Sequence, residues 1–215
     1  LVSISVKRLL DNLQSEDWAS VGLLLIYVVG FSWMTIRQHE SFQTNALDLA
    51  KFDQAIWNTA QGRPFQTTLI QNSIIKSHFS PILAIYAPLY WVWPNIRLLF
   101  IVQSTCLAGA GFLLYWFFRK DAPWVGLTVY VAYLIHPSLH QVNLFEFRRI
   151  TPAVLGISLA LFWLLKRQYG GMALALAAAL LSKENTAFFG IGMGIYLIFA
   201  HRTLKIGLPV LLVSA

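Results

Sequence analysis

The sequence predicts an all-α fold: a polytopic transmembrane helical bundle with interfacial helices in its first external loop. Hydrophobic residues make up 57 % of the 215 residues and charged residues only 12 %, whereas soluble domains carry about 25 % charged residues. The hydrophobic residues fall into many separate segments, and no short alternating strands of a β-barrel are present. The basic residues stand in pairs at segment ends, which is typical of membrane proteins and gives no sign of nucleic-acid binding.

Residues 1–17 are expected to form a lead-in on the cytoplasmic membrane surface, because their apolar residues recur at helical spacing opposite charged ones. A partly disordered terminus is the alternative. The first span is expected at 18–36, since a span needs roughly 20 mostly apolar residues. The chain starts with Leu1 and ends in an apolar stretch, so we expect it to continue beyond both ends.

The threading of the later segments depends on the run at 79–93. This run is short, contains two prolines, and is rich in Tyr and Trp, which favours an interfacial helix. If it does not cross, the basic pairs Lys7/Arg8, Arg119/Lys120, Lys166/Arg167 and Arg202 with Lys205 all fall on the cytoplasmic side, as the positive-inside tendency requires. The predicted transmembrane domain is therefore 18–215, with a cytoplasmic N-terminus and a first external loop at about 37–96. The later spans are expected at 97–118, 123–137, 152–165, 170–182, 186–200 and from 206 onward.

Two carboxylates lie in a predicted helix within this loop. Helical periodicity puts Asp53 on the apolar face, with Trp57, and Asp48 on the polar face. Asp48 has a structural explanation, because it follows a candidate N-cap at Asn45 and stands three residues before Lys51. A carboxylate on an apolar face needs a cation, a metal or a hydrogen-bond donor, so Asp53 is harder to explain without a function.

Other ionisable residues fall on the same predicted external side, and charges at membrane depth indicate function by default. Arg148 and Arg149 suggest an anionic ligand, since a guanidinium donates two parallel hydrogen bonds to a phosphate. Lys183 can neutralise a phosphate, Glu184 can join a metal or acid–base site, and His78 can act as ligand, base or phosphate contact. The structural alternatives are snorkelling arginines, a polar hairpin tip and a polar helix start.

The order of these features resembles the N-terminal half of the GT-C superfamily of membrane glycosyltransferases. More narrowly, it resembles an uncharacterised bacterial membrane-protein family with the pattern D-L-x-x-x-D-Q-x-x-W. Here that pattern is formed by Asp48, Leu49, Asp53, Gln54 and Trp57, and it is followed by "HFSP" at 78–81 and by "LLSKENTAFF". The resemblance covers nearly the whole chain, although the adjacent Asp-Glu pair usual in GT-C enzymes is absent.

The resemblance implies a sugar donor linked to polyprenyl phosphate and an acceptor that meets it at the external face. The acid early in the first external loop acts as general base or helps bind a divalent metal such as Mg or Mn. Chain order favours Asp48 for this role, and the helical face favours Asp53. By this resemblance Lys183, Arg148 and Arg149 lie near the lipid phosphate, with His78 and Glu184 as further contacts. The candidate metal ligands are Asp48, Asp53 and Glu184.

The sequence therefore favours a glycosyltransferase of the bacterial inner membrane, with membrane lipid and the polyprenyl-phosphate sugar as partners. A non-catalytic subunit of a larger membrane complex is the alternative. A transporter fits less well, because its coupling acids would lie near the bilayer midplane. The position of Asp53 distinguishes these functions. A cavity shared with Lys183, Glu184 and the two arginines favours the enzyme, and capping by one basic residue in a closed interface favours a structural role.

Overall fold

The computed structural model describes residues 14–70, 72–77, 79–200 and 203–214. Within these ranges the regular elements are all helices joined by turns and loops, with one isolated bridge between Gln66 and Ser73, which confirms the expected all-α class. Residues 1–13 of the lead-in expected at 1–17 lie outside the described residues, and its last residues, from Ser15, belong to α2. The elements are α2 (Ser15–Glu40), α3 (Ala46–Ala60), α4 (Ile74–Ser77), η1 (Pro81–Tyr86), α5 (Ala87–Val92), α6 (Arg97–Phe118), α7 (Pro123–Leu134), α8 (Pro137–Leu144), α9 (Thr151–Leu165), α10 (Tyr169–Leu180), η2 (Glu184–Thr186), α11 (Ala187–Phe199) and α12 (Leu204–Ser214).

Among the described residues, α2 and α6 are long and apolar enough to cross a membrane. The other expected spans are shorter apolar helices of 10–17 residues. The span expected at 123–137 ends earlier, at Leu134 of α7, because Pro137 starts the separate helix α8 and the preceding His136 accepts a hydrogen bond from the Ser138 amide at 3.3 Å. The stretch that follows this span in the sequence is thus helical as far as Leu144.

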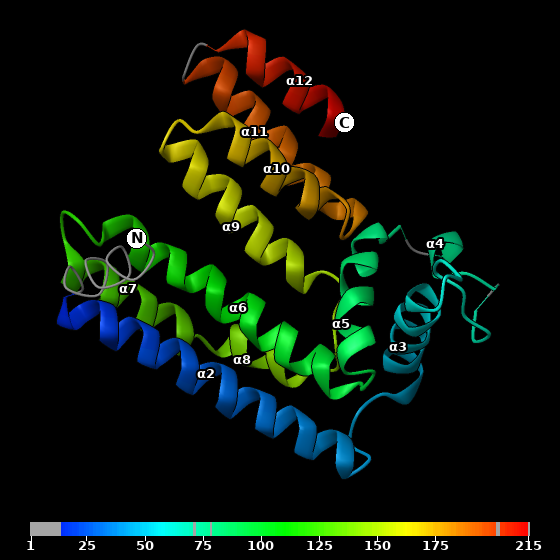
Figure 1. Ribbon diagram of the computed structural model, residues 1–215. Coiled ribbons are helices and arrows are strands. Elements are labelled where there is room, and N and C mark those ends of the chain that lie inside the picture. Colours follow the sequence, from blue (N-terminus) through cyan, green and yellow to red (C-terminus); the bar gives the residue numbers. More distant parts are fainter. Residues whose placement is uncertain (1–13, 71, 78, 201–202, 215) are drawn as a thin grey trace, which may run out of the picture.

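Helix α6 is the centre of the bundle. It packs against α2, α7, α8 and α9, while α10 lies on α9 and α12 lies on α11 (Figure 1). Close packing on α6 depends on small residues: Ala108 and Ala110 are buried, and a Cβ at Gly111 would collide with the rings of Tyr130 and Tyr133. This contact fixes α7 against α6.

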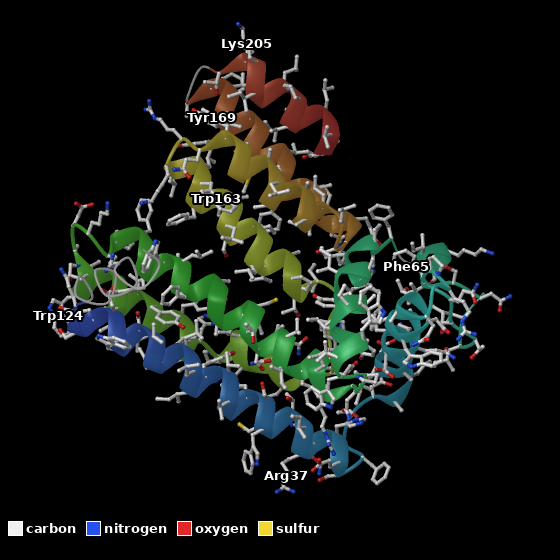
Figure 2. All side chains as sticks on the ribbon, viewed as in Figure 1. Arg37, Phe65, Trp124, Trp163, Tyr169 and Lys205 are labelled. Atoms are coloured by element: carbon white, nitrogen blue, oxygen red, sulfur yellow. The ribbon has the colours of Figure 1, made fainter. Side chains whose placement is uncertain are left out.

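The C-terminal ends of α6, α9 and α11 lie at the end of the bundle where α2 begins (Figure 1). We call this the basic end, because it carries Arg119, Lys120, Lys166, Arg167 and Lys205. Trp124, Tyr169 and Lys205 mark it in Figure 2, away from Arg37 and Phe65. The opposite end carries α3, η1, α5, the α8–α9 link and the α10–η2 turn (Figure 1).

A core of aromatic and aliphatic side chains holds this opposite end together. Phe147 of the α8–α9 link is fully buried, with its ring centroid 6.1 Å from that of Phe52 on α3 and 5.9 Å from that of Tyr86 on η1. Both pairs meet edge to face, the arrangement that aromatic quadrupoles favour. The first external helix of the sequence prediction, α3, is thus packed on segments that follow it by many residues.

A buried ion pair joins α2 to α6 at the basic end. Asp17 is 3 % exposed and accepts hydrogen bonds from Arg119 Nη2 at 2.7 Å and from the Tyr115 hydroxyl at 2.5 Å. Burial of a carboxylate is tolerated when such partners satisfy its oxygens. The pair therefore sets the register of α2 along α6.

We expect Asp17→Asn to lower the free energy of unfolding by about 2–3 kcal/mol. This value lies between the costs of breaking a surface ion pair and a buried one, because Asp17 is buried whereas Arg119 is partly exposed. Thermal unfolding of the protein in detergent measures this. Glu16→Gln is the control, since it removes the neighbouring carboxylate, which accepts a hydrogen bond from Ser15 Oγ, and leaves the Asp17–Arg119 pair in place. Equal melting temperatures for Asp17→Asn and wild type would contradict the role of the pair.

Candidate functional site

Helix α3 presents a different face to the bundle than its periodicity predicts. Leu49, Phe52, Ala55 and Ile56 are buried, whereas Trp57 is 42 % exposed. The expected apolar face was therefore partly wrong: Leu49 and Ile56 are buried as expected, but Phe52 fills the core beside Phe147 and Trp57 is turned outward. This rotation turns Asp48 toward the α8–α9 link.

Asp53 lies at the border of the buried face, and it has the partner that the sequence analysis required. The Tyr90 hydroxyl of α5 donates a hydrogen bond of 2.6 Å to Asp53 Oδ1. Burial raises the pKa of the Asp53 carboxyl, and the Tyr90 hydrogen bond and the nearby His39 oppose that rise. The partner is thus a neutral phenol, not Arg148 or Lys183, and Asp53 does not line the cavity described next.

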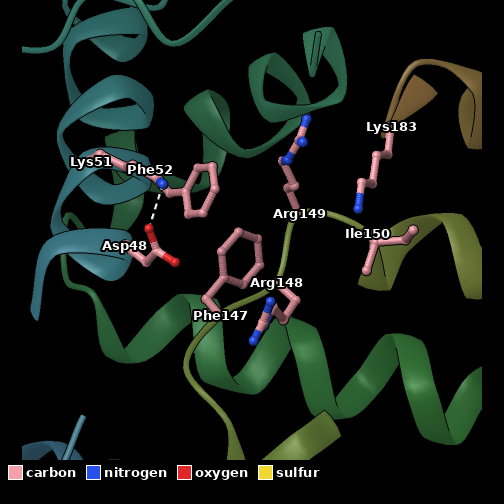
Figure 3. A pocket seen from close by; sticks show the side chains of 8 residues that line it. All are labelled: Asp48, Lys51, Phe52, Phe147, Arg148, Arg149, Ile150 and Lys183. Atoms are coloured by element: carbon pink, nitrogen blue, oxygen red, sulfur yellow. Dashed lines mark hydrogen bonds and ion pairs between the residues drawn. The ribbon is translucent and has the colours of Figure 1, made fainter. Parts of the chain in front are cut away.

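Asp48 lines a cavity of about 190 Å³ formed by three segments far apart in the sequence (Figure 3). Its walls are Asp48, Lys51 and Phe52 of α3, residues Phe147, Arg148, Arg149 and Ile150 of the α8–α9 link, and Lys183 of the α10–η2 turn. We call this the cationic pocket, because its lining residues carry four positive side chains and one carboxylate. Four of the expected site residues meet here: Asp48, Arg148, Arg149 and Lys183.

Within the pocket the carboxylate of Asp48 pairs with Lys51 (Figure 3), as the spacing on the helix allowed. Asn45 occupies the N-cap position but makes no side-chain capping bond. The side chain of Asp48 keeps 40 % of its exposure, so its other oxygen remains accessible to a bound molecule.

The guanidinium groups of Arg148 and Arg149 do not converge on one binding position. They point in opposite directions from the extended link (Figure 3). Arg149 is 9 % exposed, and its Nη1 donates to Ser80 Oγ at 2.5 Å and to the Phe79 carbonyl at 3.1 Å. Arg148 is exposed, and its guanidinium stacks on the Phe145 ring at 3.8 Å. Arg149 therefore holds segments together, and Arg148 remains open to a ligand.

Arg149 and Ser80 tie the "HFSP" segment to the site. Ser80 Oγ donates to the Ser182 carbonyl at 3.1 Å, and the Ile82 amide donates to the Leu181 carbonyl at 3.0 Å. These bonds fix the α10–η2 turn that carries Lys183. Among the described residues, none makes a hydrogen bond or ion pair with the half-buried Lys183 side chain.

Glu184 lies apart from the pocket lining: it is exposed and reaches Arg149 Nη1 at 3.5 Å. The other expected residue, His78, lies outside the described residues. The candidate metal ligands Asp48, Asp53 and Glu184 do not come together. Over the described ranges, no group of three or more His, Cys, Asp and Glu side chains is placed to hold a metal ion.

The sequence analysis missed Gln103, which positions the link that carries the arginines. This side chain of α6 is 1 % exposed. Its Nε2 donates to the Asn143 carbonyl at 3.2 Å and the Phe145 carbonyl at 3.3 Å, and its Oε1 accepts from the Arg148 amide at 2.8 Å and from Thr151 Oγ1 at 3.1 Å. A lone glutamine in the apolar run "RLLFIVQSTC" was the signal, since buried polar groups in such runs need partners.

We expect Gln103→Met, which keeps the volume but removes the amide, to destabilise the protein by about 1–3 kcal/mol because the Arg148 amide loses its acceptor. Hydrogen exchange of the amides in 142–151 should accelerate, while exchange in α11 should not change. Thr105→Val on the exposed face of the same helix is the control. Unchanged exchange in 142–151 would show that the amide does not hold the link.

Residues 38–215 match the family described as "Predicted membrane protein (DUF2079)". No curated protein and no solved structure matches the chain significantly. The matched residues include every helix from α3 onward and all residues that line the cationic pocket. The chain therefore belongs to this family of predicted membrane proteins.

Proposed function

We propose that the protein is a GT-C-like glycosyltransferase that transfers a sugar from a polyprenyl-phosphate donor at the external membrane face. One observation carries this proposal: Asp48 shares a cavity with Arg148, Arg149 and Lys183, which arrive from two other segments of the chain. A carboxylate beside several cations suits a reaction that takes a proton from one reactant and releases a phosphate from the other.

The donor phosphate would bind to Lys183 and Arg148. Lys183 has no partner among the described residues, and the guanidinium of Arg148 is engaged only by stacking on Phe145. Arg149 adds positive charge from a fixed position, because Ser80 and the Phe79 carbonyl hold it. Charge-assisted hydrogen bonds from these groups would stabilise the phosphate as its bond to the sugar breaks.

We assign the general base to Asp48 and not to Asp53. In the proposed step an acceptor hydroxyl gives its proton to Asp48, the hydroxyl oxygen bonds to the anomeric carbon, and the bond from that carbon to the phosphate oxygen breaks. Lys51 orients the carboxylate through their ion pair. Asp53 lines no wall of this cavity, and its carboxyl is held by Tyr90. Its role is to fix α5 against α3.

The membrane orientation rests on the two basic pairs in the short turns of the basic end, Arg119/Lys120 and Lys166/Arg167, and not on total charge, since the opposite end also carries basic residues such as Arg97 and Lys183. Positive residues favour the cytoplasmic side, so we place the basic end and the N-terminus in the cytoplasm of a bacterium and the cationic pocket outside the inner membrane. The first external loop would then include α3, η1 and α5, and several of the shorter apolar helices would also cross. Membrane lipids would surround the bundle and supply the polyprenyl donor.

The lining residues do not fit a divalent metal held by the protein alone. Among the described residues that line the cavity, Asp48 is the one carboxylate, and it already pairs with Lys51. A hard cation such as Mg²⁺ takes several oxygen ligands. No step of the proposed reaction therefore passes through a metal.

Transfer of radiolabelled sugar from polyprenyl-phosphate donors by the purified protein tests the proposal. We expect Asp48→Asn to lower kcat by about 10²–10⁴-fold, the usual contribution of a general base, and Lys183→Gln to raise KM for the donor. Asp121→Asn, on an exposed residue of the basic end, is the control and should keep full activity.

Asp53→Asn should retain most of the activity, because the amide oxygen can still accept from Tyr90. Full activity of Asp48→Asn with loss in Asp53→Asn would refute the base assignment. Absence of transfer by wild type from every polyprenyl-phosphate sugar would instead favour a non-catalytic membrane subunit.

A further inference from the structure

A second cavity lies on the outward side of α3. It has a volume of about 610 Å³, within the range of about 300–1,000 Å³ typical of small-molecule sites. Its lining residues are Gln54, Trp57, Asn58, Arg63, Gln66, Thr67, Thr68 and Asn72. None of them lines the cationic pocket, so the two sites are separate.

The chemistry of this outer pocket differs from that of a phosphate or lipid site. Of the eight lining residues, six have uncharged amide or hydroxyl groups, one is aromatic and one is cationic. Amides and hydroxyls both donate and accept hydrogen bonds without carrying charge. A ligand with many hydroxyl groups matches them, whereas an acyl chain would leave them unpaired.

Trp57 supplies an apolar platform in this polar surrounding. Its side chain is 42 % exposed, and an indole has an apolar ring face and a polar N–H edge. A pyranose ring has the complementary form, with C–H groups on one face and hydroxyls around its rim. A sugar lying on the indole can therefore reach the amides of the pocket wall with its rim.

The wall of the pocket is fixed before any ligand binds. Gln54 Oε1 accepts hydrogen bonds from Thr67 Oγ1 at 2.7 Å and from the Thr68 amide at 3.0 Å. Asn58 Nδ2 donates to the Gln66 carbonyl at 2.9 Å. These bonds tie the loop after α3 to the helix itself, so little conformational entropy is lost on binding. Of the described residues, none hydrogen-bonds the exposed side chains of Gln66 and Asn72.

Among the described residues that line the outer pocket, Arg63 is the one with a charged side chain. Its guanidinium carbon lies 5.4 Å from the centroid of the Trp57 ring, at the platform on which the ligand would lie. A guanidinium donates paired hydrogen bonds to a carboxylate. An acidic sugar is therefore favoured over its neutral counterpart.

We propose that the outer pocket binds a saccharide, and that it binds a sugar with a carboxylate more tightly than the matching neutral sugar. Trp57 stacks on the sugar ring, Gln66 and Asn72 bind its hydroxyls, and Arg63 binds the carboxylate. This inference does not rest on the proposed transfer reaction, because the outer pocket lies on the other side of α3.

Saturation-transfer NMR on the purified protein in a sugar-free detergent tests the inference. The probes are D-glucose, D-galactose, D-mannose, N-acetyl-D-glucosamine and D-glucuronic acid. We expect saturation of the sugar protons, with glucuronic acid the tightest ligand. Trp57→Ala should weaken binding at least ~10-fold, since it removes the aromatic contact surface.

Three further variants make the result specific. Trp93→Ala, on another exposed tryptophan outside the pocket, should bind as wild type does. Arg63→Gln should abolish the preference for glucuronic acid over glucose, and Gln66→Ala should weaken all the sugars without affecting folding. No sugar signal that depends on Trp57, or a Trp57-dependent signal from a Gly-Ser-Gly peptide alone, would overturn the inference.

Discussion

The hydrogen bonds of Gln103 are the interaction on which the cationic pocket depends. This one buried amide bonds the carbonyls that end α8, the Arg148 amide and the start of α9. An extended link between two helices has backbone groups that no helix satisfies, and Gln103 satisfies several of them from the neighbouring helix. Phe147 then enters the core against Phe52 and Tyr86. The link is thereby fixed at both sides, and its arginines take defined positions.

Helix α3 connects this core with two different sites. Its buried side packs on Phe147, its first turn brings Asp48 and Lys51 to the cationic pocket, and its last turns bring Trp57 and Asn58 to the outer pocket. Asp53 lies at the border, where the Tyr90 hydroxyl replaces the ion pair that a buried carboxylate otherwise requires. The two acids of one helix thus differ because their neighbours from other segments differ.

The all-α class and the approximate positions of most long helices followed from the pattern of apolar runs. Four charged residues that line the cationic pocket were also candidates from the sequence, because Asp48, Arg148, Arg149 and Lys183 are charged residues next to apolar segments in a chain with few charges. The buried face of α3 was not predictable from its own sequence. Whether Phe52 or Trp57 is the buried aromatic residue depends on Phe147, which lies far along the chain. The roles of Tyr90 and Gln103 were not predicted for the same reason. Their hydrogen-bond partners are determined by the packing of distant segments and not by spacing in the sequence. The span expected at 123–137 ended close to the break between α7 and α8, but no helix was expected from Pro137 to Leu144.

The central claim is that the cationic pocket recognises the phosphate of a polyprenyl lipid. Native mass spectrometry of the protein with polyprenyl phosphate, and with the uncharged polyprenol of the same length, measures this directly. We expect the phosphate lipid to bind at least ~10-fold more tightly than the alcohol, a difference that corresponds to one or two charge-assisted hydrogen bonds, and Lys183→Gln with Arg148→Gln to remove the difference. Equal binding of the two lipids by wild type would contradict the account.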